Sequence, residues 1–177
     1  MNMQTLSFVL STLGLVSMIA ASLIKGRKMK LILFFVFCSN VLFATSYLLA
    51  GSGINGAASC YLGGLQAIIN YFFDSKGKPL PKWLVALYAL GFVAVNLVFG
   101  SFNGLTVLAI VASLSFVMCI GQKNGAKYRF WVIVNSILWC IYDLISKSYG
   151  AFVSHIVLLG FTVVGMIIHD RKKGNEK

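Results

Sequence analysis

Two apolar segments carry polar and aromatic side chains at helical spacing. Asn40 and Tyr47 are seven residues apart, so in a helix they lie on one face. Asn135, Trp139 and Tyr142 share one face of a later helix in the same way. An amide offers donors and an acceptor to a polar solute, and aromatic rings offer a stacking wall. The pattern indicates either a central solute pathway or amides that bond neighbouring helices, and the residues leave both open.

Asp143 is the only acidic residue expected within a helix, where a charge needs a partner or a wet cavity. One candidate partner is Lys147 at i+4, which would form an ion pair near the end of the helix. The other is His155 on the next helix, and an acid beside an imidazole can hold or pass a proton. Asp143 and His155 are therefore a candidate proton site, with the simple ion pair as the alternative.

A third apolar segment adds two amides. Gln66 and Asn70 are four residues apart, and Asn70 lies toward the end of that segment. They are candidates for the inner half of a solute path, and bridging of helix ends is an equal alternative. Gly63 and Gly64 in the same segment indicate close helix packing.

The sequence contains none of the common catalytic motifs. The chain lacks a zinc-protease His-Glu-x-x-His motif, a nucleophile elbow, a P-loop and an acidic pair for Mg²⁺, and it has four acidic residues in all. Its four cysteines are scattered in apolar runs without metal-ligand spacing, as small buried hydrophobes would be. We expect no enzyme, no metal and no cofactor. Because the sequence has no ATP-hydrolysing motif, any transport would be facilitated or ion-coupled.

The elements that position these residues are predicted to cross a membrane. Hydrophobic residues make up 59% of the 177-residue chain and charged residues 11%, whereas soluble domains average about 45–50% and 25%. A crossing needs about 20 apolar residues. The sequence predicts an all-α integral membrane protein with seven transmembrane helices. Their expected ranges are 6–24, 31–50, 56–73, 83–99, 105–120, 130–145 and 149–168.

The positive charges predict the orientation of these helices. Loops 1–2, 3–4 and 5–6 and the tail hold four, three, three and four Lys or Arg residues, and the opposite face holds only Lys147. Cytoplasmic loops carry such an excess, so we expect the N-terminus outside and the C-terminus in the cytoplasm. The first apolar run precedes its positive charges, unlike a signal peptide. The basic face would contact anionic lipid or serve only as a topology signal, and no nucleic acid is expected.

An internal repeat emerges when the sequence is shifted by 95 residues. Asn40 then falls on Asn135 and Tyr47 on Tyr142, and the expected helices align without a gap. Both copies start on the same side, so the repeats are parallel, as in one known transporter plan. The predicted units are residues 1–75, the first three-helix repeat; 76–101, a loop and linker helix; and 102–177, the second repeat and basic tail.

This 3+1+3 plan resembles that of the SWEET, PQ-loop and PnuC-like transporters. The short length, the Asn-x6-Tyr spacing in the second and sixth helices and the basic first loop look more closely like the YgjV family of bacterial inner-membrane proteins. That resemblance implies a multi-pass protein of the bacterial inner membrane. The intramembrane prolines and Pro-Gln dipeptides of SWEET and PQ-loop repeats are absent, so no sugar-binding residue is carried over.

The expected function is a small transporter or facilitator for a polar metabolite, with alternating access between two three-helix bundles. The alternative is a membrane-embedded receptor, regulator or assembly partner, since the KDEL receptor shows that this plan need not transport. The expected partners are the lipid bilayer and a small polar solute. The sequence leaves the oligomeric state open, homo-oligomers included.

Overall fold

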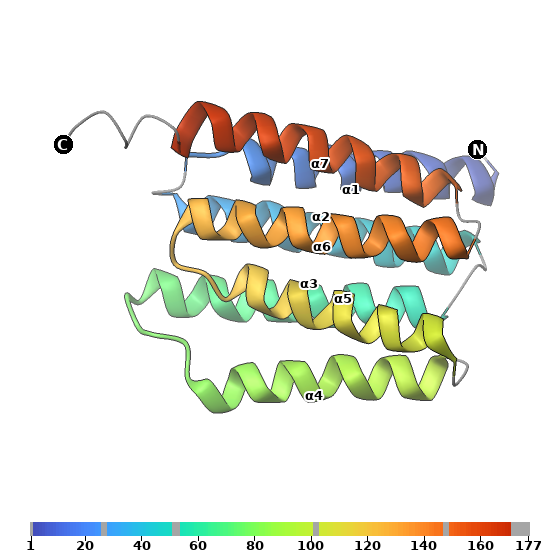
Figure 1. The fold of residues 1–177 in the computed structure, drawn as a ribbon, viewed down its shortest axis with the longest axis horizontal. Helices are drawn as coiled ribbons and strands as arrows, with labels where there is room; N and C mark the ends of the chain where they lie inside the picture. Colours follow the sequence, from blue (N-terminus) through green and yellow to red (C-terminus); the bar gives the residue numbers. More distant parts are fainter. Residues whose placement is uncertain (1, 26–27, 51–53, 101–102, 147–148, 171–177) are drawn as a thin grey trace.

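The computed structural model describes residues 2–25, 28–50, 54–100, 103–146 and 149–170, and within them it forms seven helices and no strand (Figure 1). The helices are α1 Met3–Leu23, α2 Met29–Ala50, α3 Ile54–Ser75, α4 Lys82–Phe99, α5 Gly104–Ile120, α6 Gly125–Ile145 and α7 Tyr149–Asp170. The predicted all-helical class and each of the seven expected helices are therefore present.

The helices form two layers of three that close into a ring. In one layer α2 packs between α1 and α3, and in the other α6 packs between α5 and α7. The layers meet where α1 contacts α7 and where α3 contacts α5, while α4 packs on α3 and α5 (Figure 1). Residues far apart in the sequence thus become neighbours at the α1–α7 contact.

Described lysines gather at one end of this bundle, which also holds the end of α7 (Figure 1). We call it the basic end and the opposite one, where α1 starts, the N-terminal end. Lysines at the basic end are Lys25, Lys28, Lys30, Lys76, Lys78, Lys82, Lys123 and Lys127. Arg27, Lys147 and the cations of the tail lie outside the described residues.

Two sequence expectations about helix ends were wrong. The sixth helix was expected from residue 130, but α6 begins at Gly125 because the Asn124 side chain accepts a hydrogen bond from the Ala126 amide at 2.9 Å. Arg129, counted as a loop cation, is therefore helical. Asp143 is also not the only helical acid, because α3 and α7 extend past their apolar runs to include Asp74 and Asp170.

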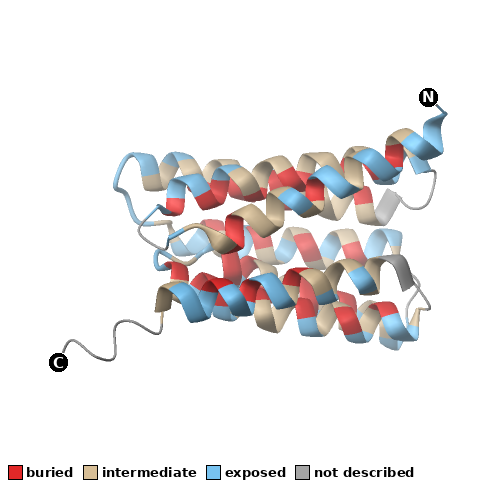
Figure 2. Ribbon diagram, turned by 90° about the horizontal axis from the view of Figure 1, so that it is seen from above, coloured by how far each residue is buried: buried red, intermediate tan, exposed pale blue. Residues whose placement is uncertain are grey.

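The outer faces of the helices are apolar. Phe8, Val98, Trp83 and Leu90 are each at least 66% exposed, as lipid-facing side chains would be. Figure 2 shows such exposed positions on the outer sides of the helices. By length and composition, α1, α2, α4, α6 and Ala151–Asp170 of α7 suffice to cross a membrane, whereas α5 is apolar but shorter.

The buried apolar side chains fill mainly one half of the bundle. The larger cluster joins both layers and comprises Ala21, Met29, Ile32, Leu33, Val36, Ala67, Cys119, Ile120, Tyr128, Val132 and Leu158. The smaller one packs α4 on α5 and comprises Leu84, Tyr88, Phe92 and Val117. All but Phe92 and Leu158 lie nearer the basic end of their helix. Apolar side chains thus fill most of the basic half.

Candidate functional site

An acid and an imidazole meet at the N-terminal end of the α6–α7 interface. Asp143, near the end of α6, places Oδ2 2.7 Å from Nδ1 of His155, near the start of α7. Asp143 is 3% exposed, and the His155 side chain is 27% exposed. Of the two partners expected for Asp143, the structure brings His155 into contact, and Lys147 lies outside the described residues.

Aromatic rings surround this pair. The Trp139 indole stacks on the His155 imidazole, with ring centroids 6.0 Å apart and planes at 9°. Tyr142 meets the indole edge-on, at 5.2 Å between centroids. From the other layer, the Tyr47 hydroxyl lies close enough to Asp143 and Tyr142 to interact electrostatically, and Tyr47 is 36% exposed. We call these five residues the N-terminal cluster.

The hydrogen bond between the pair sets the tautomer of His155. An ionised carboxylate can only accept, so Nδ1 of His155 donates to Asp143. In the neutral imidazole Nε2 is then left as the acceptor. The partly exposed His155 ring can therefore take up a proton, or accept a hydrogen bond from a polar solute.

The two repeat-matched amides bond backbone carbonyls. Asn135 donates from Nδ2 to the Ala112 carbonyl on α5 at 2.7 Å and to Ser115 Oγ at 2.9 Å. Asn40 donates instead to the Val36 carbonyl of its own helix at 2.8 Å. Its oxygen rests on Gly63, where an added Cβ would stand 2.6 Å away, so this glycine permits close packing as predicted.

The α3 amides also donate to α5. Asn70 Nδ2 lies 2.8 Å from the Ile120 carbonyl, and Gln66 Nε2 lies 3.4 Å from that of Val117. Both side chains are buried, and Gln66 Oε1 has no hydrogen-bond partner among the described residues. The contacts of Asn70 and Gln66 match the bridging alternative and leave a solute role as a prediction.

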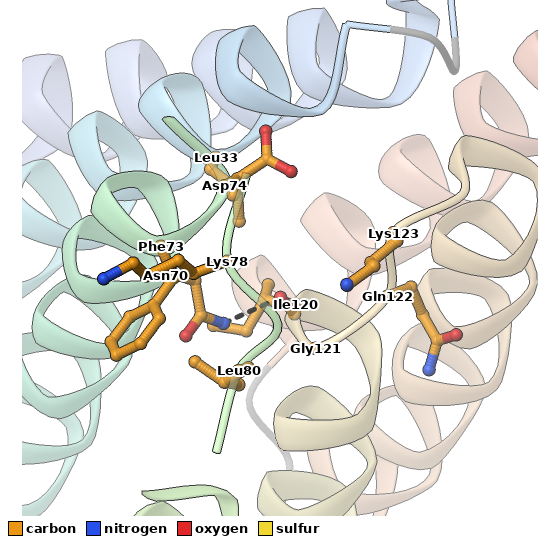
Figure 3. Close-up of a pocket in the computed structure, with 10 residues that line it drawn as sticks. All are labelled: Leu33, Asn70, Phe73, Asp74, Lys78, Leu80, Ile120, Gly121, Gln122 and Lys123. Atoms are coloured by element: carbon orange, nitrogen blue, oxygen red, sulfur yellow. Dashed lines mark hydrogen bonds between the residues drawn. The ribbon is translucent and has the colours of Figure 1, made fainter. Parts of the chain in front are cut away.

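A small pocket opens beside Asn70 at the basic end (Figure 3). Its volume is about 30 Å³, room for roughly two water molecules. Figure 3 shows the Asn70 amide directed at Ile120 on its wall. The lining residues are Leu33, Asn70, Phe73, Asp74, Lys78, Leu80, Ile120, Gly121, Gln122 and Lys123. This pocket contacts neither Asn40 nor Asn135.

A second ionic site lies at the basic end of the same α6–α7 interface. Arg129 is fully buried and holds Asp170 with two hydrogen bonds, of 2.9 Å from Nε and 2.6 Å from Nη2. Its Nη1 donates to the Ile24 carbonyl at the end of α1, at 2.9 Å. His169 Nε2 lies 2.8 Å from the neighbouring Leu23 carbonyl. We call these five residues the basic-end clamp.

Sequence reasoning missed Arg129 because its charge was counted among the loop cations. A signal was present: Arg129 precedes Asp143 by 14 residues, or two heptads, which places both on one face of a continuous helix. Within the described residues, no group of three His, Cys, Asp or Glu side chains gathers as metal ligands would.

Comparison with known proteins identifies one family. A family model described as bacterial inner membrane protein, Imp-YgjV, matches residues 2–173. Searches of curated proteins and of solved structures gave no match.

Proposed function

The chain belongs to the Imp-YgjV family of bacterial inner membrane proteins, as the sequence resemblance implied, and on that premise we propose that it is a small transporter for a polar metabolite and not an enzyme. All seven helices cross the bilayer, with the N-terminal end outside and the basic end in the cytoplasm. The described lysines at the basic end support this orientation. The helices α3 and α5 pack against each other as part of the helix ring, and Asn70 of α3 bonds a carbonyl of α5. Both observations support the proposal that these two helices also cross the bilayer.

The observation that carries this proposal is the contrast between the two halves of the bundle. Apart from the small pocket beside Asn70, the basic half is filled by apolar side chains, and the clamp at Arg129 ties α6 and α7 to α1. The opposite half presents the partly exposed Tyr47 and His155 from facing layers. A polar solute would enter from the outer side and meet aromatic walls, an imidazole acceptor and a carboxylate.

Alternating access would come from rocking of one layer against the other. Two of the three helix pairs support parallel repeats. The bounds of α7 lie 95 residues after those of α3, and those of α6 lie 96 and 95 residues after those of α2, whereas α5 begins 101 residues after α1. α4 would be the linker of a 3+1+3 plan similar to that of SWEET and PQ-loop proteins. Opening the basic end would require breaking the bonds from Arg129 and His169 to the α1 carbonyls.

A membrane-embedded receptor, regulator or assembly partner is the second candidate. This alternative is supported by the hydrogen bonds of Asn40 and Asn135, whose amide groups donate to backbone carbonyls and to a neighbouring side chain. Such bonds hold a bundle together without any solute.

The first test is thermal unfolding of the purified protein against sugars, nucleosides, amino acids and vitamin precursors. A ligand that binds only the folded state raises its stability by mass action. We expect one class to stabilise the wild type and the control Trp83→Ala, whose indole is exposed on α4, but not Trp139→Ala. Liposomes containing the protein should then accumulate that compound. Binding without accumulation would support the receptor alternative.

A further inference from the structure

Polar side chains recur at every seventh residue along α6. Arg129, Ser136 and Asp143 are each at most 3% exposed. Seven residues are close to two helical turns, so the three share a face. Arg129 and Asp143 both bond side chains of α7, which turns this face, Ser136 included, toward α7.

The facing helix has the same spacing. His155, Thr162 and His169 are also seven residues apart, and Thr162 is fully buried. Thr162 Oγ1 lies 3.0 Å from Ser22 Oγ of α1, which is fully buried too. At the helix rise of 1.5 Å per residue, each step covers about 10 Å.

Because α6 and α7 run antiparallel, the two series coincide level by level (Figure 1). Asp143 meets His155 at the N-terminal end. Ser136 comes seven residues before Asp143 and Thr162 seven residues after His155, so both lie one step closer to the basic end. At the basic end Arg129 bonds Asp170, next to His169. Buried polar groups thus extend over about 20 Å of a hydrocarbon core about 30 Å thick.

Each level can take up and give off a proton. At the first, Nε2 of His155 is the free acceptor. At the second, Ser136 Oγ is buried without a hydrogen-bond partner among the described residues, and the hydroxyls of Thr162 and Ser22 both donate and accept. At the third, a carbonyl only accepts, so His169 Nε2 donates to Leu23 and its Nδ1 is left as the acceptor.

We propose that this polar stripe on α6, α7 and α1 conducts protons between the two ends of the bundle. The inference rests on the proposed transporter function, for which the proton would be the coupling ion. A proton adds at Nε2 of His155 while the Nδ1 proton leaves by way of Asp143. Water and the three hydroxyls each accept one proton and pass one on, and His169 releases one at the basic end. One proton crosses, and no group is oxidised or reduced.

Other titratable groups lie near both ends of this proton path. Around Asp143, Tyr47 of α2 interacts with it electrostatically, and Tyr142 and Cys140 are near it on α6. At the basic end Arg129 is the charged neighbour of His169, and its charge is paired with Asp170. Because Arg129 and Asp170 are paired with each other, we assign the proton exchange at this end to His169. Buried chains of acids and histidines of this kind mark proton relays in membrane proteins.

Water must bridge the steps of about 10 Å between levels, since a hydrogen bond spans only about 3 Å. In the present closed conformation Val132 and Leu158 pack in the core beside the stripe. Proton flow therefore requires α6, α7 and α1 to move apart far enough to admit water between them, and the proposed rocking would move α7 relative to α1.

The test is proton entry into liposomes that contain the full chain and an internal pH-sensitive dye, driven by a potassium-diffusion potential without any solute. Thr162→Val and Ser136→Ala remove a hydroxyl with little change of shape. The matched control is Thr45→Val on α2, where the threonine also bonds the carbonyl four residues before it, at 2.8 Å, but lies outside the stripe. We expect proton entry in the wild type and the control, at least a tenfold lower rate in Thr162→Val and Ser136→Ala, and none in His155→Gln.

Thermal unfolding of each variant establishes that it is folded. Proton entry no faster than in protein-free liposomes, or wild-type rates in folded Thr162→Val and Ser136→Ala, would overturn the proposal and leave the stripe with a packing role. Solute accumulation in the same liposomes separates the two ideas. Solute accumulation without proton entry would support the transporter and contradict the proton path. Proton entry without accumulation of any solute would support the proton path and contradict the transporter.

Discussion

Neighbouring helices meet through small residues in α1–α3 and through charged or amide side chains in α5–α7. In the first layer an added Cβ at Gly14 would stand 3.2 Å from the Phe43 ring, and one at Gly56 3.3 Å from the Tyr47 ring. In the second layer α6 is tied to α7 by Asp143–His155 and Arg129–Asp170, and to α5 by the Asn135 amide. The two layers have similar shapes but different chemistry.

Positions 95 residues apart make the contrast sharper. Phe34, Leu48, Cys60 and Ser75 occupy the places of Arg129, Asp143, His155 and Asp170. Phe34 and Leu48 are exposed apolar side chains, as a lipid-facing surface would be. Conversely, Gly63 and Gly64 correspond to Leu158 and Leu159.

This difference in contacts between the two layers indicates which layer can respond to a change of charge. Contacts on glycine carry no charge, so protonation leaves them unaltered. In the second layer the Asp143–His155 contact joins an acid to an imidazole, and a proton can move between them. We infer that the first layer is a fixed frame, and that the N-terminal end of the second layer is the part that switches.

The largest effect should come from removing the clamp. Arg129→Ala leaves Asp170 without its partner and removes a bond to α1, so we expect a loss of about 3–5 kcal/mol in the free energy of unfolding. Unfolding in detergent by SDS titration would measure it. Lys127→Ala makes the same charge change at an exposed position on α6 and should alter stability by no more than about 0.5 kcal/mol. Equal losses in the two variants would contradict the anchoring role of Arg129.

The next effect tests the packed layer. An alanine Cβ at Gly63 would stand 2.6 Å from Asn40 Oδ1 and 3.0 Å from the Phe116 ring, so Gly63→Ala should destabilise by about 1–3 kcal/mol. The adjacent Gly64→Ala is the control, since its nearest contact would be an ordinary 3.5 Å. It should be neutral, or stabilising by up to about 1 kcal/mol through helix propensity. If both variants are tolerated equally, the first layer is not held by close approach.

Local signals in the sequence were enough to predict the seven helices and the lysines that gather at one end. Hydropathy and charge act residue by residue, so they need no knowledge of which helices pack together. Asp143 and His155 could be matched because they lie on consecutive antiparallel helices joined by a short connection.

Contacts between distant segments could not be predicted in this way. The Arg129 guanidinium reaches the Ile24 carbonyl, 105 residues away in the sequence, and it does so only because α7 closes the ring against α1. The acceptors of Asn135 and Asn70 include backbone carbonyls, which every residue carries and no sequence pattern marks.

The smallest effect compares the two repeat-matched amides. Asn135→Ala removes the bonds to Ala112 and Ser115 on α5, and bonds between membrane helices contribute roughly 0.6–1.7 kcal/mol. Asn40→Ala removes a bond within its own helix and should cost less. SDS titration of both variants and of the double variant would measure the two losses and their coupling. Equal losses with strong coupling would mean that the amides act together across the layers, as the central-pathway hypothesis requires. A larger loss for Asn135 without coupling would assign it to holding α6 on α5, and would leave the N-terminal cluster as the place where a solute binds.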